Sequence, residues 1–115
     1  MTSASIEPAD IPAVPYFLVL LVPQDDRAVE PAVFTDHVAF IEHMASEGIV
    51  LLGGGFETPI EGASAAYLLH TASKAEAEAW AARDPLMTSG AYRPKVIAWH
   101  LVGIAPGAID PALAT

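Results

Sequence analysis

The stretch Tyr16-Phe-Leu-Val-Leu-Leu-Val22 is an uninterrupted apolar run that ends at Pro23. It shows no helical period, and its length is typical of one buried strand. Successive side chains of a strand point to opposite sides, so this strand presents apolar groups on both of its faces. A membrane-spanning helix needs about 18 apolar residues, and no run in the chain approaches that length. The fold must therefore cover both faces of this strand with protein.

The composition narrows the class of protein. The chain has 115 residues, of which 53% are hydrophobic, so one domain with its own core is expected. Asp and Glu number 14 against 5 Lys and Arg, which gives a formal net charge of −9 at pH 7. Nucleic acid and anionic membranes repel such a surface, so we expect neither as a partner. Cysteine is absent, which excludes disulfides, thiolate metal ligands and cysteine nucleophiles.

The two ends of the chain differ from its middle. Residues 1–15 contain three prolines and no apolar period, which predicts a flexible leader. This stretch has neither the basic nor the apolar region of a secretory signal, so we expect a cytoplasmic protein. Residues 103–115 are predicted to form a second loose tail, which leaves 16–102 as the folded domain.

Local signals place two helices and four strands in that domain. Pro31 suits the first turn of a helix, and Gly48 suits its end. Ser73 and Glu76 have the spacing of a capping box, and Asp84 before proline ends the helix that they begin. We expect strands at 16–22, 49–52, 65–70 and 95–102, helices at 31–47 and 73–83, and a turn at 58–63.

The resulting order, β-α-β-β-α-β, is that of the split β-α-β or ferredoxin-like fold. This α+β fold has an antiparallel sheet with both helices on one face. The uncovered face of such a sheet should be polar. Here the first strand is apolar on both faces, and the last strand also presents apolar side chains on both of its faces. These side chains are Ile97, Trp99 and Leu101 against Val96, Ala98 and Val102. We therefore expect a homodimer that packs sheet against sheet.

His37 occupies the centre of an apolar stripe on the first predicted helix. At 100° per residue, the residues within about 60° of it are Val33, Phe34, Phe40, Ile41, Met44 and Gly48. A buried imidazole needs hydrogen-bond partners for its ring nitrogens. A backbone carbonyl in the core could satisfy the ring, or the ring could act as a general base. Position alone does not separate these two interpretations.

Asp84 continues the buried face of the second helix, since it lies four residues after Trp80 and seven after Ala77. The simplest interpretation is that it caps a short turn that includes Leu86. In a split β-α-β fold, however, both helices lie side by side on one face of the sheet, so Asp84 can reach His37. We predict that the two side chains lie about 2.6–3.2 Å, or one water, apart. His37 would then be a general base, and Asp84 would orient it.

The other three histidines carry weaker signals. His43 lies on the polar face of its helix, and we expect it to be solvated. His70 and His100 lie near strand ends, where packing is the simpler interpretation. No pair of histidines has the spacing of metal ligands, so we expect no metal and no cofactor.

The run Gly53-Gly54-Gly55 lacks the lysine and the following helix of a phosphate-binding loop. We expect it to end a strand and to leave room and N–H donors for a ligand, at Gly54 and Gly55. Tyr92, which follows Gly90, could bring a phenol to the same place. Ordinary packing at a strand edge is the simpler interpretation of this tyrosine.

Together these residues resemble the YciI-like family, which is built on the YCII-related domain. The matching features are the apolar first strand, Asp36-His37-Val38, Gly48 with Ile49-Val-Leu-Leu-Gly53-Gly54, Glu76-Ala-Glu-Ala-Trp80, and Asp84-Pro85 with Gly90 and Tyr92. The resemblance covers residues 16–102 and implies a ferredoxin-like fold that forms a dimeric α+β barrel. It also implies an active site built from His37 and Asp84. Many members carry arginine three residues before the histidine, where this chain has Phe34, so we expect a more apolar pocket.

The resemblance implies cofactor-independent acid–base chemistry by His37 and Asp84, of the lyase or dehydrochlorinase kind. The substrate would be a small aromatic or quinonoid compound, with Gly54, Gly55 and Tyr92 as ligand-binding residues. The alternative is a non-catalytic dimeric ligand-binding or accessory domain, in which the pair only stabilises the fold. A cofactor-free oxygenase is a third interpretation, which rests on fold analogy alone. An open pocket beside His37 would distinguish the first interpretation from the second.

Overall fold

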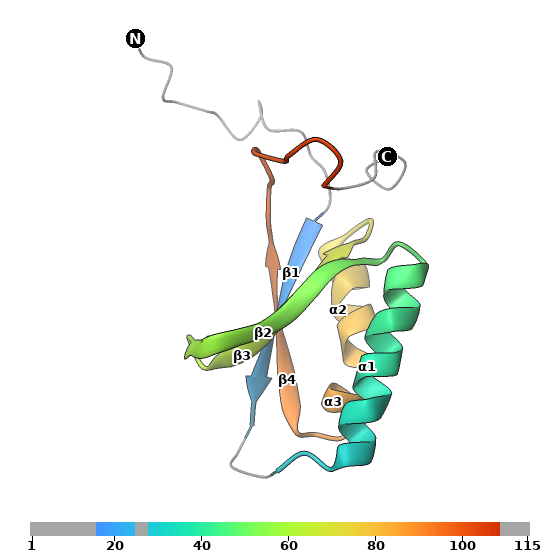
Figure 1. Cartoon of the computed structure of the whole chain (residues 1–115), viewed down its shortest axis with the longest axis vertical. Coiled ribbons are helices and arrows are strands. Elements are labelled where there is room, and N and C mark those ends of the chain that lie inside the picture. The colour runs from blue at the N-terminus through green and yellow to red at the C-terminus, as the bar shows by residue number, and fades with distance from the viewer. Residues whose placement is uncertain (1–15, 25–27, 109–115) are drawn as a thin grey trace.

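The computed structural model describes residues 16–24 and 28–108 of the chain, and Figure 1 shows how they are arranged. The strands are β1 (Tyr16–Pro23), β2 (Val50–Ile60), β3 (Ala63–His70) and β4 (Tyr92–Ala98). The helices are α1 (Pro31–Ser46), α2 (Lys74–Ala82) and α3 (Pro85–Thr88). The predicted leader 1–15 and residues 109–115 of the predicted tail lie outside the described residues. Residues 99–108 form neither helix nor strand.

The four strands form one antiparallel sheet in the order β2-β3-β1-β4. The helices α1 and α2 lie on the same side of this sheet (Figure 1). This arrangement is the ferredoxin-like α+β fold that the sequence predicts. Within the described ranges, no helix is long and apolar enough to cross a membrane.

The helix ends lie close to their predicted positions. Pro31 opens α1, and Gly48 adopts a φ of 75°, the left-handed conformation that commonly follows a helix. The hydroxyl of Ser73 accepts a hydrogen bond from the N–H of Glu76 at 3.1 Å and caps α2. The carboxylate of Glu76 accepts from the N–H of Ala72 at 3.3 Å, one residue before the donor that a capping box uses.

The edge strand β2 is longer than predicted. It does not end at Leu52 but continues through the glycines to Ile60, because the glycines pair with residues 65–67 of β3. The predicted turn at 58–63 shrinks to Glu61 and Gly62, which have φ angles of 52° and 80°. A glycine weakens a strand locally, but it does not prevent the backbone from pairing with a neighbouring strand. The pairing partner therefore decides where β2 ends.

The core lies between the sheet and the helices. Its buried members are Phe17, Val19, Leu21, Met44, Val50, Tyr67, Leu69, Ala77, Ala81 and Leu86. The helix α1 contributes only Met44 to this set, so the predicted buried stripe around His37 is partly wrong. Phe34, which the stripe includes, is 55% exposed. The reason is that the first turns of α1 border a cavity, which is described below.

The last strand is shifted from the predicted 95–102 to 92–98, because it pairs with β1 along its whole length. The register places Ile97 opposite Leu18, on the face of the sheet away from the core. Ile97 is 38% exposed there, and Leu52 of β2 is 58% exposed. Large apolar side chains on the face away from the helices are therefore in contact with solvent in the single chain.

Candidate active site

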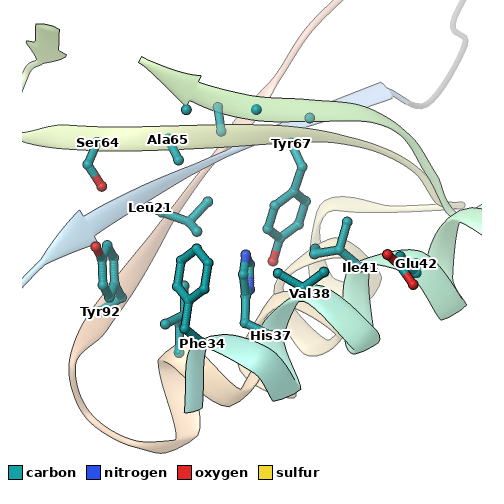
Figure 2. Close-up of a pocket in the computed structure, with 15 residues that line it drawn as sticks. Leu21, Phe34, His37, Val38, Ile41, Glu42, Ser64, Ala65, Tyr67 and Tyr92 are labelled. Carbon is teal, nitrogen blue, oxygen red and sulfur yellow. The ribbon is translucent and has the colours of Figure 1, made fainter. Parts of the chain in front are cut away.

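His37 lies on the side of α1 that faces the sheet, and Figure 2 shows its imidazole between Phe34 and Val38. The ring of Phe34 packs beside it, with centroids 5.9 Å apart and planes tilted by 48°. The side chain of His37 is 14% exposed. The helical spacing thus gives His37 apolar neighbours on its own helix while part of the imidazole stays open.

Asp84 is fully buried between α2 and α3. It is the N-cap of α3, where its Oδ1 accepts a hydrogen bond from the N–H of Leu86 at 2.9 Å. The same carboxylate meets His37, whose Nδ1 lies 2.8 Å from Oδ1 and 2.9 Å from Oδ2. The two sequence interpretations of Asp84, a cap and a partner for His37, are therefore combined in one side chain.

Tyr67 joins this pair, although no sequence motif marks it. It is buried on β3, and its hydroxyl donates to Oδ2 of Asp84 at 3.4 Å. Burial raises the pKa of Tyr67 far above its usual value, and the charge of Asp84 and the hydrogen bond raise it further. The phenol therefore stays protonated and remains a donor. The sequence signal for it is only general, namely that a buried tyrosine hydroxyl needs a partner.

These hydrogen bonds decide which nitrogen of neutral His37 holds the proton. A carboxylate only accepts, and Asp84 already accepts from a backbone N–H and a phenol. Nδ1 therefore donates its proton to Asp84, and Nε2 keeps a free lone pair. No hydrogen bond joins Nε2 to another residue in the described part of the chain. His37 thus presents a base, with a carboxylate behind it that can stabilise the protonated ring.

His37 borders a cavity of about 410 Å³ that lies between α1 and the sheet (Figure 2). A cavity of roughly 150 Å³ can bind benzene, so this one has room for a substituted ring or for two fused rings. Its walls are mostly apolar, and no lysine or arginine of the described ranges lines it. The lining residues are Leu21, Phe34, His37, Val38, Ile41, Glu42, Gly53, Gly54, Gly55, Ser64, Ala65, Ala66, Tyr67, Leu86 and Tyr92.

Four of the five predicted site residues border this one cavity. His37 comes from α1, Gly54 and Gly55 from β2, and Tyr92 from the start of β4. Asp84 does not border the cavity, because it is buried behind His37. The sequence did not single out Glu42, Ser64 or Tyr67 as lining residues.

The remaining histidines do not border the cavity. His70 stacks on Tyr16, with ring centroids 5.3 Å apart and planes 29° apart. His43 and His100 are exposed. Across residues 16–24 and 28–108, no three His, Cys, Asp or Glu side chains are grouped in a way that could hold a metal ion.

The sheet order and the cavity define the class of this protein, a small ferredoxin-like α+β domain with an apolar site beside a histidine–carboxylate pair. The YCII-related domain family matches residues 16–100, and the chain belongs to this family, as its motifs predict. A search of curated protein sequences found no match.

One solved structure that is similar to this chain is 5-chloro-2-hydroxyhydroquinone dehydrochlorinase (TftG) from Burkholderia phenoliruptrix AC1100, in complex with 2,5-dihydroxybenzoquinone. The TM-score is 0.52 and the sequence identity is 16%, and the similarity covers 73% of this chain and 92% of that chain. At this level of identity, the similarity concerns the fold.

Proposed function

We propose that this protein is a small-molecule enzyme that performs cofactor-independent acid–base chemistry, with His37 as its general base. The observation that carries the proposal is the setting of the imidazole. Asp84 holds one ring nitrogen, and the ring borders an apolar cavity. Asp84 acts as a positioning residue, which fixes the tautomer and stabilises the imidazolium that forms when Nε2 takes a proton.

The proposed reaction is an elimination from a small aromatic or quinonoid compound. The substrate reacts as its keto tautomer, in which one ring hydroxyl has become a carbonyl and its proton has moved to the carbon that bears chlorine, so that this carbon is sp³. Nε2 takes the proton of a remaining enol hydroxyl, and the electron pair of that O–H bond forms a second carbonyl. The neighbouring double bond shifts by one position, and chloride leaves the adjacent sp³ carbon with its own bonding pair. The net loss is HCl, without oxidation or reduction. The similar fold of the dehydrochlorinase and the size of the cavity support this reaction class.

Two further parts of the proposal concern binding and assembly. Gly54, Gly55 and Tyr92 border the cavity, and we propose that they contact the ligand. The exposed apolar side chains on the outer face of the sheet support a homodimer that covers this face.

Release of chloride from chlorinated hydroquinones, followed together with the absorbance of the quinone product, tests the proposal. His37→Ala should fold and lose turnover. His43→Ala is a matched control, because His43 is an exposed histidine of the same helix that does not border the cavity. A wild-type protein without turnover, in which His37→Ala lowers stability and leaves ligand binding intact, would favour the non-catalytic ligand-binding or accessory domain.

A further inference from the structure

The glycines of β2 differ in whether the fold has room for a side chain at their position. A Cβ atom on Gly53 would lie 2.8 Å from the Cβ of Tyr67, which is closer than such atoms approach each other. Gly53 pairs with Tyr67, and Tyr67 in turn donates to Asp84. The fold therefore needs glycine at position 53, because a side chain there would push Tyr67 away from Asp84.

The fold does not require glycine at position 55. Its φ lies outside the left-handed region, and a Cβ atom there would meet only the carbonyl oxygen of Ser64, at an ordinary contact distance of 3.9 Å. A glycine also weakens a strand, and β2 is an edge strand with one neighbour. Stability alone would thus favour a side chain at position 55.

A side chain at position 55 would enter the cavity. Gly55 pairs with Ala65, which packs toward the core. Figure 2 shows Ala65 on the wall of the cavity opposite Phe34 and His37. Gly55 and Ala65 both line the cavity. The space that the missing side chain leaves is therefore on the ligand side of the sheet, across from the proposed base.

We propose that Gly55 determines the size of the ring that the cavity accepts beside His37. The ligand class is a flat, uncharged aromatic compound of one or two rings. A flat ring is inferred because Gly55 and Ala65, which pair across β2 and β3, project at most one side-chain carbon from this part of the wall and leave room for the face of a ring. An anionic ligand is disfavoured because no described lysine or arginine lines the cavity whereas Glu42 does, and the mostly apolar walls disfavour a charge of either sign. The inference rests on the proposed function only in taking this cavity as the ligand site.

Phenol and 2-naphthol are suitable probes, since both are uncharged at neutral pH and differ by one ring. Binding is measured by calorimetry, and amide spectra locate it through shifts at Ala65 and His37. The wild type should bind both probes. Gly55→Val should lower the affinity for 2-naphthol about tenfold or more, because extra carbons in a filled site are costly. It should lower the affinity for phenol about threefold or less. Gly55→Ala should weaken 2-naphthol by a smaller factor.

Gly103→Val is the matched control, because Gly103 lies outside the cavity and a Cβ atom there would meet no atom within 4 Å. It should bind both probes as the wild type does. If valine disturbs β2, Gly55→Ala, which adds one carbon, carries the same test. Equal loss of both probes, full retention of 2-naphthol, or a wild type that binds neither probe would overturn the inference. Failure of the proposed function would be recognised separately, because the probes would then bind in a size-dependent way while no chloride is released from chlorinated hydroquinones.

Discussion

Nδ1 of His37 lies 2.8 Å from one carboxylate oxygen of Asp84 and 2.9 Å from the other, and the two residues are 47 positions apart in the chain. The same carboxylate also caps α3. The carboxylate of Asp84 therefore orients the proposed base and also caps the N-terminus of α3. A change at this position should affect catalysis and stability together, whereas a change at His37 should affect mainly catalysis.

Asp84→Asn should lower kcat of the proposed reaction about 10²- to 10⁴-fold. The reason is that an asparagine amide can donate to Nδ1, which moves the imidazole proton to Nε2. KM should change little, since Asp84 does not border the cavity. The free energy of unfolding should fall by about 1–3 kcal/mol, because buried donors lose a charged acceptor. Steady-state kinetics and urea unfolding measure the two effects.

Asp36→Asn is the control for the loss of one negative charge, because Asp36 is an exposed aspartate of α1. It should leave kcat and stability close to their wild-type values. If Asp84→Asn retained full kcat, the orienting role of Asp84 would be wrong.

Tyr67→Phe should change how stability depends on alkaline pH. The pKa of Tyr67 is raised in the folded protein. Above about pH 10 the unfolded tyrosine ionises, while the folded one keeps its proton. The stability that this group contributes is therefore complete below about pH 10 and falls by up to about 1.4 kcal/mol per pH unit above it.

Urea unfolding from neutral pH to about pH 11 checks this prediction. At neutral pH, Tyr67→Phe should be about 1 kcal/mol less stable, because it lacks the hydrogen bond to Asp84. Above about pH 10 its stability should decline less steeply than that of the wild type. Parallel declines in the two proteins would contradict the prediction.

Much of the fold could be predicted because its elements carry local signals. Pro31, Gly48 and Ser73 mark helix ends through backbone geometry and capping, which depend on neighbours in the sequence. The course of β2 could not be predicted in the same way. Its glycines indicate the end of a strand locally, and only pairing with β3 carries the strand on to Ile60.

In the site, too, some contacts could be predicted from the sequence and others could not. Helical spacing and strand order bring His37 and Asp84 together, so their contact could be inferred. Phe34 was expected in the core by the same spacing, but it stands at the cavity, where no sheet residue covers it enough to bury it. The contact of Tyr67 with Asp84 joins a strand to a helix junction, and no local pattern in the sequence encodes it.

The outer face of the sheet should form the dimer interface. Ile97 and Leu52 expose apolar side chains on that face, and an isologous pair of sheets would remove them from water. We expect a dimer at micromolar concentration. Ile97→Glu should convert it to a folded monomer, because each copy would bury an unpaired carboxylate in the interface.

Size-exclusion chromatography with light scattering measures the mass, and circular dichroism checks that the variant is folded. His43→Glu adds the same carboxylate at an exposed position of α1, on the other side of the sheet, and should remain dimeric. A monomeric wild type, or a dimeric Ile97→Glu, would show that this face is not the interface.

The charge preference of the cavity should be controlled at Phe34. This side chain is 55% exposed and borders the cavity beside His37, so arginine can replace it without burying a charge. The wild type should bind phenol more tightly than benzoate, because no described lysine or arginine lines the cavity. Phe34→Arg should raise the affinity for benzoate about tenfold, through a charge-assisted hydrogen bond, and salt should weaken this gain. Calorimetric titration at two salt concentrations measures both effects. Phe34→Met, which adds no charge, should show no gain, and an equal gain in both variants would mean that space rather than charge controls binding.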